Sequence, residues 1–214
     1  MEHLMTRQLD LILKEGGVDY DWQADLEIVP KYLDQKGKNW LTEILDDLGG
    51  NGSLPLLEKL KFDFKIGRYF ILWDEELHFN RYRLITLRSE LYGEFNFPFS
   101  ESLKRLCRTY EKEALKSGMN PRAWIGPPIA KSLFGQASEP GDFTGNGATG
   151  WKLNAYNDAQ MDLQTRIHGY KLIRLTPYET LMTGGSLKRL DQILVNPKEE
   201  QRQMVYNWLM RKLA

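Results

Sequence analysis

Acidic residues and a histidine gather in one short stretch of the chain, residues 61–83. Asp63 lies in the sequence Lys-Phe-Asp-Phe, and Asp74 begins an Asp-Glu-Glu-Leu-His run. Carboxylates are ligands that Mg²⁺ and Mn²⁺ prefer, and such an ion activates water and stabilises charge at a phosphate. The spacing therefore predicts metal ligands at Asp63 and Asp74. Glu76 would complete the ligand set, and His78 would assist proton transfer or contact a substrate phosphate.

A simpler explanation of the same stretch stays open. A run such as Asp-Glu-Glu is typical of a solvated strand end, and a histidine followed by phenylalanine is more often packed or on the surface than catalytic. The Asn-Arg-Tyr-Arg segment that comes next supplies Arg81 and Arg83 as candidate phosphate contacts. Exposed arginines are nevertheless common in proteins of any function, so the surrounding elements must decide between the two explanations.

Two strands and a turn are expected to carry the acidic residues. Residues 61–64 alternate charged and aromatic side chains, which is typical of a half-buried strand. Residues 68–73, Arg-Tyr-Phe-Ile-Leu-Trp, predict a central strand because aromatic and β-branched residues favour sheets. Gly67 lies between the two runs, so the pattern predicts a β-hairpin with this glycine in its turn. In that hairpin, Asp63 and Asp74 would meet at one edge of the sheet.

Helical periodicity dominates the rest of the chain. Apolar residues recur at helical spacing in five segments, 5–13, 40–48, 103–114, 156–167 and 204–213. A further strand is predicted at 170–175. After it, the sequence Thr-Pro-Tyr-Glu at 176–179 predicts a capping box with proline at the first helical position.

The order of these blocks resembles the core of the PD-(D/E)xK nuclease superfamily, and most closely its very-short-patch-repair-like endonuclease branch. An Asp-Phe pair on a strand, a short turn, and a hydrophobic strand ending in Asp-x-x-x-His occupy residues 63–78. The second block is a helix with acidic and basic residues, here Asp158, Asp162 and Arg166, followed by Gly-Tyr-Lys-Leu-Ile-Arg-Leu at 169–175. Together the two blocks cover well under half of the chain.

The resemblance implies a fold and an activity. The fold class would be α/β (α+β), with a restriction-endonuclease-like core sheet flanked by helices. An N-terminal helical lobe would span residues 1–55 and the core 56–214, with a long insertion at about 81–150. The activity would be hydrolysis of DNA phosphodiesters, with Mg²⁺ or Mn²⁺ bound by Asp63 and Asp74. A restriction, repair or defence setting would be natural for such an enzyme.

Arg174, on the predicted strand at 170–175, has two interpretations. It would contact a backbone phosphate of nucleic acid, or it would form an ion pair with an aspartate of the preceding helix. Asp158, Asp162 and Arg166 themselves lie at i, i+4 and i+8, a spacing that also fits ordinary pairing along a helix face.

One position departs from the family pattern. Counting back from His78, the acidic residue of the branch falls on Leu72, and its glycine falls on Glu75. Without that carboxylate, Asp63 and Asp74 are the only matched acids unless a neighbouring glutamate substitutes. The alternative function is therefore a catalytically degenerate nuclease-fold protein that binds nucleic acid or another protein. If the resemblance were accidental, the chain would be a helical binding module.

A Gly-rich polar segment extends from Gly135 to Gly150. It does not match a phosphate-binding P-loop, because no Gly-Lys-Ser/Thr follows. A flap over the site and a plain connection both stay open. Nearby, Trp124, Phe143 and Trp151 are candidates for stacking on unpaired bases, although packing in the core is the commoner role of tryptophan.

The composition limits the remaining alternatives. The 214 residues carry 29 Lys+Arg and 29 Asp+Glu, but the first 60 hold 12 acidic and 6 basic residues, so the other 154 are net positive by six. This asymmetry permits nucleic-acid binding without requiring it. No apolar run is long enough to cross a membrane, and no secretory signal is expected from MEHLMTRQLD. The single cysteine, Cys107, excludes an internal disulfide. We therefore expect a cytoplasmic protein, and a homodimer stays open.

Overall fold

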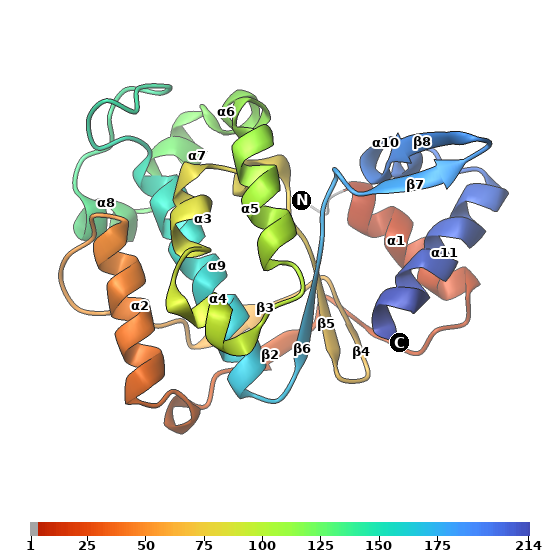
Figure 1. Ribbon diagram of the computed structural model, residues 1–214, viewed down its shortest axis with the longest axis horizontal. Coiled ribbons are helices and arrows are strands. Elements are labelled where there is room, and N and C mark those ends of the chain that lie inside the picture. Colours follow the sequence, from red (N-terminus) through yellow and green to blue (C-terminus); the bar gives the residue numbers. More distant parts are fainter. Residues whose placement is uncertain (1–3) are drawn as a thin grey trace. The chain divides into compact units, whose positions relative to one another are not determined.

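The structure is a computed structural model that describes residues 4–214 (Figure 1). It is a mixed α/β fold, and the chain divides into two units, each of which gathers segments from different parts of the sequence. The first unit consists of Met1–Leu26, Lys61–Asp74 and Tyr170–Ala214, and the second consists of Glu27–Leu60 and Glu75–Gly169. Most of the strands belong to the first unit, whereas the second is almost entirely helical.

A four-stranded sheet with the strand order β1-β4-β5-β6 organises the first unit. β4 (Phe64–Ile66) and β5 (Tyr69–Trp73) form an antiparallel hairpin, and Gly67 in its turn has a φ of 55°. The predicted hairpin is therefore confirmed, although its first strand begins at Phe64 and not at residue 61. β6 (Lys171–Leu175) pairs in parallel with β5, and β1 (Asp21–Trp22) pairs antiparallel with β4. The two blocks that carry the nuclease resemblance thus supply three neighbouring strands of one sheet.

Three helices of the first unit bury apolar faces in a common core with the strands. They are α1 (Leu4–Glu15), α10 (Leu190–Leu194) and α11 (Glu199–Leu213). The predicted helices near both ends of the chain are confirmed by α1 and α11. Their apolar residues lie three and four positions apart, so they face the same side. The fully buried core side chains include Leu9, Leu13, Phe64, Ile71, Leu175, Leu190, Leu194 and Val205.

The helix predicted after Thr176 is wrong. Residues 176–179 form a turn, and the chain continues as the hairpin of β7 (Thr180–Thr183) and β8 (Ser186–Arg189). The carbonyl of Glu179 accepts a hydrogen bond from the N–H of Leu190, at the start of α10. Between the strands, Gly184 and Gly185 both have positive φ, which a tight hairpin turn requires. The pair Gly184-Gly185 was the sequence signal for this hairpin. The Thr-Pro-Tyr-Glu pattern at 176–179 indicated a helix start that the structure does not have.

The second unit is built around α9 (Thr149–Ile167), against which α2 (Gln35–Asp47), α3 (Arg81–Thr86), α7 (Pro121–Ile125) and α8 (Pro128–Phe134) pack (Figure 1). Helices α3 to α8 come from the segment that was predicted as a long insertion. The other elements of this unit are η1 (Pro30–Tyr32), η2 (Glu76–His78), α4 (Glu90–Phe95), α5 (Ser100–Thr109) and α6 (Glu111–Gly118). Two short strands, β2 (Asp25–Glu27) and β3 (Lys59–Lys61), form a separate two-stranded sheet.

The tryptophans beside the Gly-rich segment belong to the interior of the second unit. Trp124 and Trp151 are both 0% exposed, and their ring centroids lie 5.3 Å apart. Phe143, from the Gly-rich segment, packs on both rings. The segment is also held by the indole N–H of Trp124, which donates to the carbonyl of Ser138 over 2.8 Å. These rings are therefore core residues, and base stacking is wrong for the two tryptophans.

Two expectations about the environment of the chain concern Cys107 and membranes. Cys107 is buried on α5, as expected for a small core residue. Within residues 4–214, no helix combines the length and the apolar character that crossing a membrane requires.

Candidate functional site

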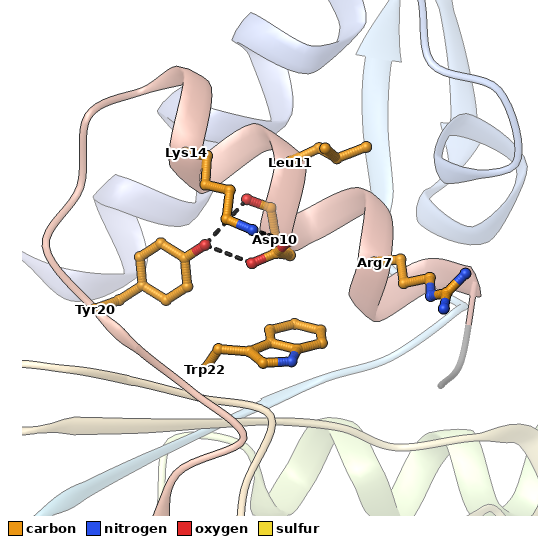
Figure 2. A pocket seen from close by; sticks show the side chains of 6 residues that line it. All are labelled: Arg7, Asp10, Leu11, Lys14, Tyr20 and Trp22. Atoms are coloured by element: carbon orange, nitrogen blue, oxygen red, sulfur yellow. Dashed lines mark hydrogen bonds and ion pairs between the residues drawn. The ribbon is translucent and has the colours of Figure 1, made fainter. Parts of the chain in front are cut away.

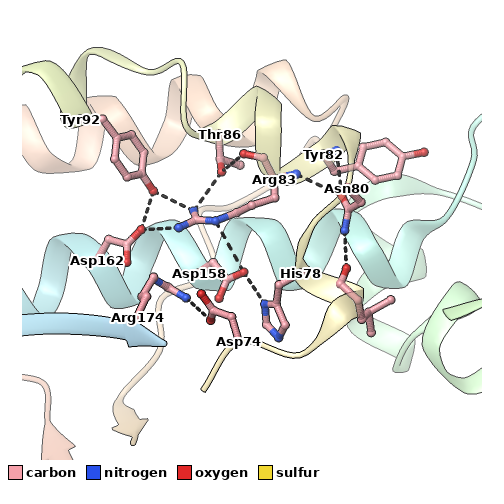
Figure 3. Close-up of polar contacts among 11 residues, drawn as sticks. Asp74, His78, Asn80, Tyr82, Arg83, Thr86, Tyr92, Asp158, Asp162 and Arg174 are labelled. Carbon is pink, nitrogen blue, oxygen red and sulfur yellow. Dashed lines mark hydrogen bonds and ion pairs between the residues drawn. The ribbon is translucent and has the colours of Figure 1, made fainter. Parts of the chain in front are cut away.

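Three charged side chains are buried together in the second unit, and α9 supplies two of them. Asp158 and Asp162 lie one helical turn apart and are 3% and 0% exposed. Arg83, from α3, is 2% exposed and its Nη2 donates to Oδ2 of Asp162 over 2.6 Å (Figure 3). Its Nε lies 3.8 Å from Oδ2 of Asp158. Because an unpaired buried charge is costly, this arginine is what allows two carboxylates to lie inside the unit.

Two hydroxyl groups complete the hydrogen bonding of Arg83. Tyr92, on α4, accepts from Nη1 of Arg83 over 2.8 Å and donates to Oδ2 of Asp162 over 2.7 Å. Thr86 accepts from the same Nη1 over 3.1 Å. Burial alone would lower the pKa of the Arg83 guanidinium, but the facing Tyr92, Asp162 and Asp158 raise that pKa well above its usual value. The arginine therefore stays charged and fixes the positions of its partners.

His78 connects this buried group to the surface of the second unit. It ends η2, and its ring is 27% exposed. Nδ1 of His78 lies 2.7 Å from Oδ2 of Asp158, whose own side chain is 4% exposed. One carboxylate oxygen thus faces both the imidazole and the guanidinium of Arg83. Figure 3 shows the histidine and the arginine approaching this oxygen from different sides.

Asn80 is the residue that sets the geometry between η2 and α3. Its side-chain oxygen accepts from the N–H groups of Tyr82 and Arg83, which makes it the N-cap of α3. Its side-chain amide donates to the carbonyl of Leu77, within η2. A single short side chain therefore orients the segment that carries His78 and the helix that carries Arg83.

An imidazole that donates to a buried carboxylate is oriented to act as a general base. An ionised carboxylate only accepts hydrogen bonds, so with Asp158 in that form Nδ1 of His78 carries the hydrogen and Nε2 carries the lone pair of the neutral ring. Nε2 is then the atom that takes up a proton, and Asp158 stabilises the imidazolium that forms. The pair has the chemistry to deprotonate a water or a hydroxyl nucleophile.

The predicted metal ligands Asp63 and Asp74 both belong to the first unit. Asp63 precedes β4, and its Oδ2 accepts from the backbone N–H of Trp73 over 2.6 Å. Asp74 follows β5, is 1% exposed, and accepts through Oδ1 from Nη1 of Arg174 over 2.5 Å. Both carboxylates therefore lie at the open end of the predicted hairpin. Leu72, where the nuclease resemblance would require an acidic residue, is in register with Arg174 across β5 and β6.

The three arginines predicted as phosphate contacts are all paired with carboxylates. Arg83 and Arg174 are 2% and 4% exposed, and their partners include Asp162 and Asp74 respectively. Both guanidinium groups are held by carboxylates inside their units, so neither is presented to a phosphate at the surface in this structure, and their role as phosphate contacts stays a prediction. Arg81 is 44% exposed in its side chain and forms a bidentate ion pair with Glu111. Glu76 lies in η2, half-buried.

Sequence reasoning missed the link between His78 and α9. It treated Asp158 and Asp162 as partners of Arg166 along one helix face, whereas Arg166 is exposed and the two aspartates face Arg83. Tyr92 was not singled out at all. The available signal was helical spacing, because Asp158 and Asp162 each lie three residues after a buried alanine of the same helix, Ala155 and Ala159.

Comparison with known proteins gives one match. The model of a family of unknown function (DUF7255) matches residues 43–196, which is more than half of the chain. No curated protein and no solved structure gives a significant match.

Proposed function

We propose that this chain, which belongs to the family of unknown function DUF7255, is a nuclease-like protein that hydrolyses DNA phosphodiesters with His78 as the proton acceptor. The observation that carries the proposal is the 2.7 Å hydrogen bond between Nδ1 of a partly exposed His78 and the buried carboxylate of Asp158. Burying a carboxylate costs free energy, and here the buried carboxylate of Asp158 orients one imidazole. The choice of DNA as substrate rests on the resemblance of the hairpin and β6 blocks to nucleases.

The proposed reaction needs one proton acceptor and one electrophile. Nε2 of His78 takes a proton from water as the water oxygen forms a bond to phosphorus. The bond between phosphorus and the leaving oxygen breaks, and the leaving oxygen takes up a proton from solvent. Asp158 is a positioning residue, because it acts through His78, and Arg83 in turn holds Asp158. General-base assistance of this kind typically contributes about 10²- to 10⁴-fold in rate.

Mg²⁺ or Mn²⁺ belongs to the proposal as the cofactor, with Asp63 and Asp74 as the residues that would hold it. The donor set suits such an ion, because both side chains offer hard oxygen atoms and a carboxylate has about four acceptor positions. Arg174 reduces the net negative charge that Asp74 offers. When bound, the ion would stabilise the charge that develops on the phosphate oxygens.

A second candidate function is a catalytically degenerate protein that binds nucleic acid or another protein without cleaving it. The ion pair between Asp74 and Arg174 favours it, because a buried arginine competes with a dication for the same carboxylate. Leu72, which is apolar where the nuclease pattern has an acidic residue, favours this second candidate as well.

The test is a cleavage assay on single- and double-stranded DNA with Mg²⁺, with Mn²⁺, and with EDTA. We expect divalent-dependent cutting by the wild type, and loss of cutting in the Asp63→Asn, Asp74→Asn double variant. The matched control is Asp46→Asn, Asp47→Asn, which removes the same charge from exposed positions of α2 and leaves cutting unchanged. Circular dichroism verifies that each variant is folded. DNA binding by the wild type without cutting, on every substrate and with both metals, would establish the second candidate instead.

A further inference from the structure

A pocket of about 580 Å³ lies in the first unit, on the exposed side of α1 (Figure 2). Its volume falls in the range of roughly 300–1,000 Å³ that is typical of small-ligand sites. None of the residues used in the proposed reaction lines it. The lining residues are Arg7, Asp10, Leu11, Lys14, Tyr20 and Trp22.

Two aromatic rings of the pocket are held in fixed orientations. The ring of Trp22 packs edge-on against Phe64, with centroids 4.9 Å apart, and the ring of Tyr20 packs edge-on against the same Phe64 at 5.8 Å. The hydroxyl of Tyr20 also donates to Oδ1 of Asp10 over 2.5 Å. Because these contacts already exist without a ligand, little ordering entropy opposes stacking of a flat molecule on the half-buried indole.

Two of the side chains that line the pocket are cationic. Arg7 and Lys14 lie seven residues apart on α1, about two helical turns, so they face the same side of the helix. Asp10 is the one acidic residue of the lining, and its Oδ2 lies 2.7 Å from Nζ of Lys14. Burial and the bond to Asp10 raise the pKa of the Tyr20 hydroxyl, so this residue stays neutral at physiological pH. Two cations against one carboxylate, beside an indole, suit a ligand that is both aromatic and anionic.

We infer that this pocket binds one unpaired nucleotide of single-stranded DNA. The base stacks on Trp22, and the adjoining phosphate is contacted by Arg7 and Lys14. Arg7, Leu11 and Lys14 are exposed, so the rim is open and a strand can continue beyond the pocket on either side of the bound nucleotide. The choice of DNA rests on the proposed function, whereas the aromatic and anionic character of the ligand rests on the pocket alone.

Binding of a fluorescently labelled oligothymidylate, followed by anisotropy at low salt, tests the stacking contact. We expect Trp22→Ala to weaken binding about tenfold or more, since stacking on an aromatic ring typically contributes this much per base. Trp22→Phe keeps a flat ring against Phe64 and should lose less. Trp208→Phe, on α11, is the matched control and should bind as the wild type does. Thermal melting identifies any variant that fails to fold.

The charged contacts are tested independently of Trp22 at exposed positions. Arg7→Gln with Lys14→Gln should lower the slope of log affinity against log salt by about one to two, because each lost phosphate contact removes about one unit. Lys198→Gln with Arg211→Gln makes the same change in net charge at other exposed positions of this unit and should leave the slope unchanged. No binding of the oligonucleotide by the wild type, or wild-type binding by both Trp22→Ala and the Arg7, Lys14 variant, would overturn the inference.

The outcome is separable from that of the proposed function. If wild-type protein cleaves duplex DNA but fails to bind the oligonucleotide, the pocket inference falls and the nuclease proposal stands. If it binds through Trp22 and cleaves nothing, the pocket inference stands and the nuclease proposal falls.

Discussion

The interiors of the two units differ in where their buried charges lie. The first unit is held together by an apolar cluster that joins α1, α10 and α11 to the strands, and its buried ion pair between Asp74 and Arg174 lies where β5 and β6 end. In the second, the central helix α9 buries Asp158, Asp162, Gln160 and Gln164 among its apolar residues. Apolar packing stabilises a fold without demanding one geometry, whereas buried charges need partners at defined positions. The buried polar network of the second unit therefore stabilises the fold less than apolar packing would. It fixes the position of one group, the imidazole of His78.

The largest expected effect comes from removing the cation of the polar interior. Arg83→Met leaves Asp158 and Asp162 facing each other without their guanidinium, so we expect the free energy of unfolding to fall by about 3–5 kcal/mol. Urea denaturation measures it. Arg81→Met, two residues earlier, breaks the half-exposed pair with Glu111 and should cost no more than about 1 kcal/mol. Equal losses in the two variants would mean that the buried network has no special role.

In the apolar interior, the corresponding change is the loss of methyl groups. Leu9→Ala on α1 removes a fully buried side chain and should lower the free energy of unfolding by about 2–5 kcal/mol through lost packing and a residual cavity. Leu11, two positions along, is 48% exposed, so Leu11→Ala should change stability by no more than about 0.5 kcal/mol. Comparable losses at both positions would contradict the assignment of the buried face of α1.

The sequence predicted the apolar interior far better than the polar one. Leu9, Ile12 and Leu13 repeat at helical spacing, and the Phe-Ile-Leu run of β5 follows a turn that contains Gly67, so local pattern alone predicts α1 and the hairpin. The contact of His78 with Asp158 joins residues 80 positions apart, and no local spacing encodes it. Periodicity reports which face of an element is buried, but it does not report which buried charges meet.

The side-chain amide of Gln164 tests whether polar groups inside the second unit cost stability. Both polar atoms of the Gln164 side chain are buried on α9 without a hydrogen-bond partner among the described residues. Gln164→Met keeps the length of the side chain and removes the cost of burying the amide, so stability should rise by about 1 kcal/mol. Thermal and urea unfolding measure this change. Destabilisation would show that the amide has a role beyond filling space.

The smallest expected effect concerns a carboxyl of the first unit. Burial raises the pKa of Glu179 above its ordinary value of 4.5, although Lys212 opposes the shift. Ionisation is therefore harder in the folded state, so its contribution lowers stability as the pH rises above about 4.5. Glu179→Gln should be more stable than the wild type at pH 7, by less than about 1 kcal/mol, and the difference should vanish near pH 4. Urea unfolding at both pH values checks the sign.

The central claim, that the polar interior orients His78 for phosphodiester hydrolysis, is tested most directly by one pair of histidine variants. His78→Gln is compared with His168→Gln, at a histidine of the same unit whose ring contacts the N–H of Val29 and the carbonyl of Gln164. DNA cleavage is measured with Mg²⁺ and with Mn²⁺. We predict a loss of about 10²-fold or more for His78→Gln and an unchanged rate for His168→Gln. Cleavage by His78→Gln at the wild-type rate would contradict the account.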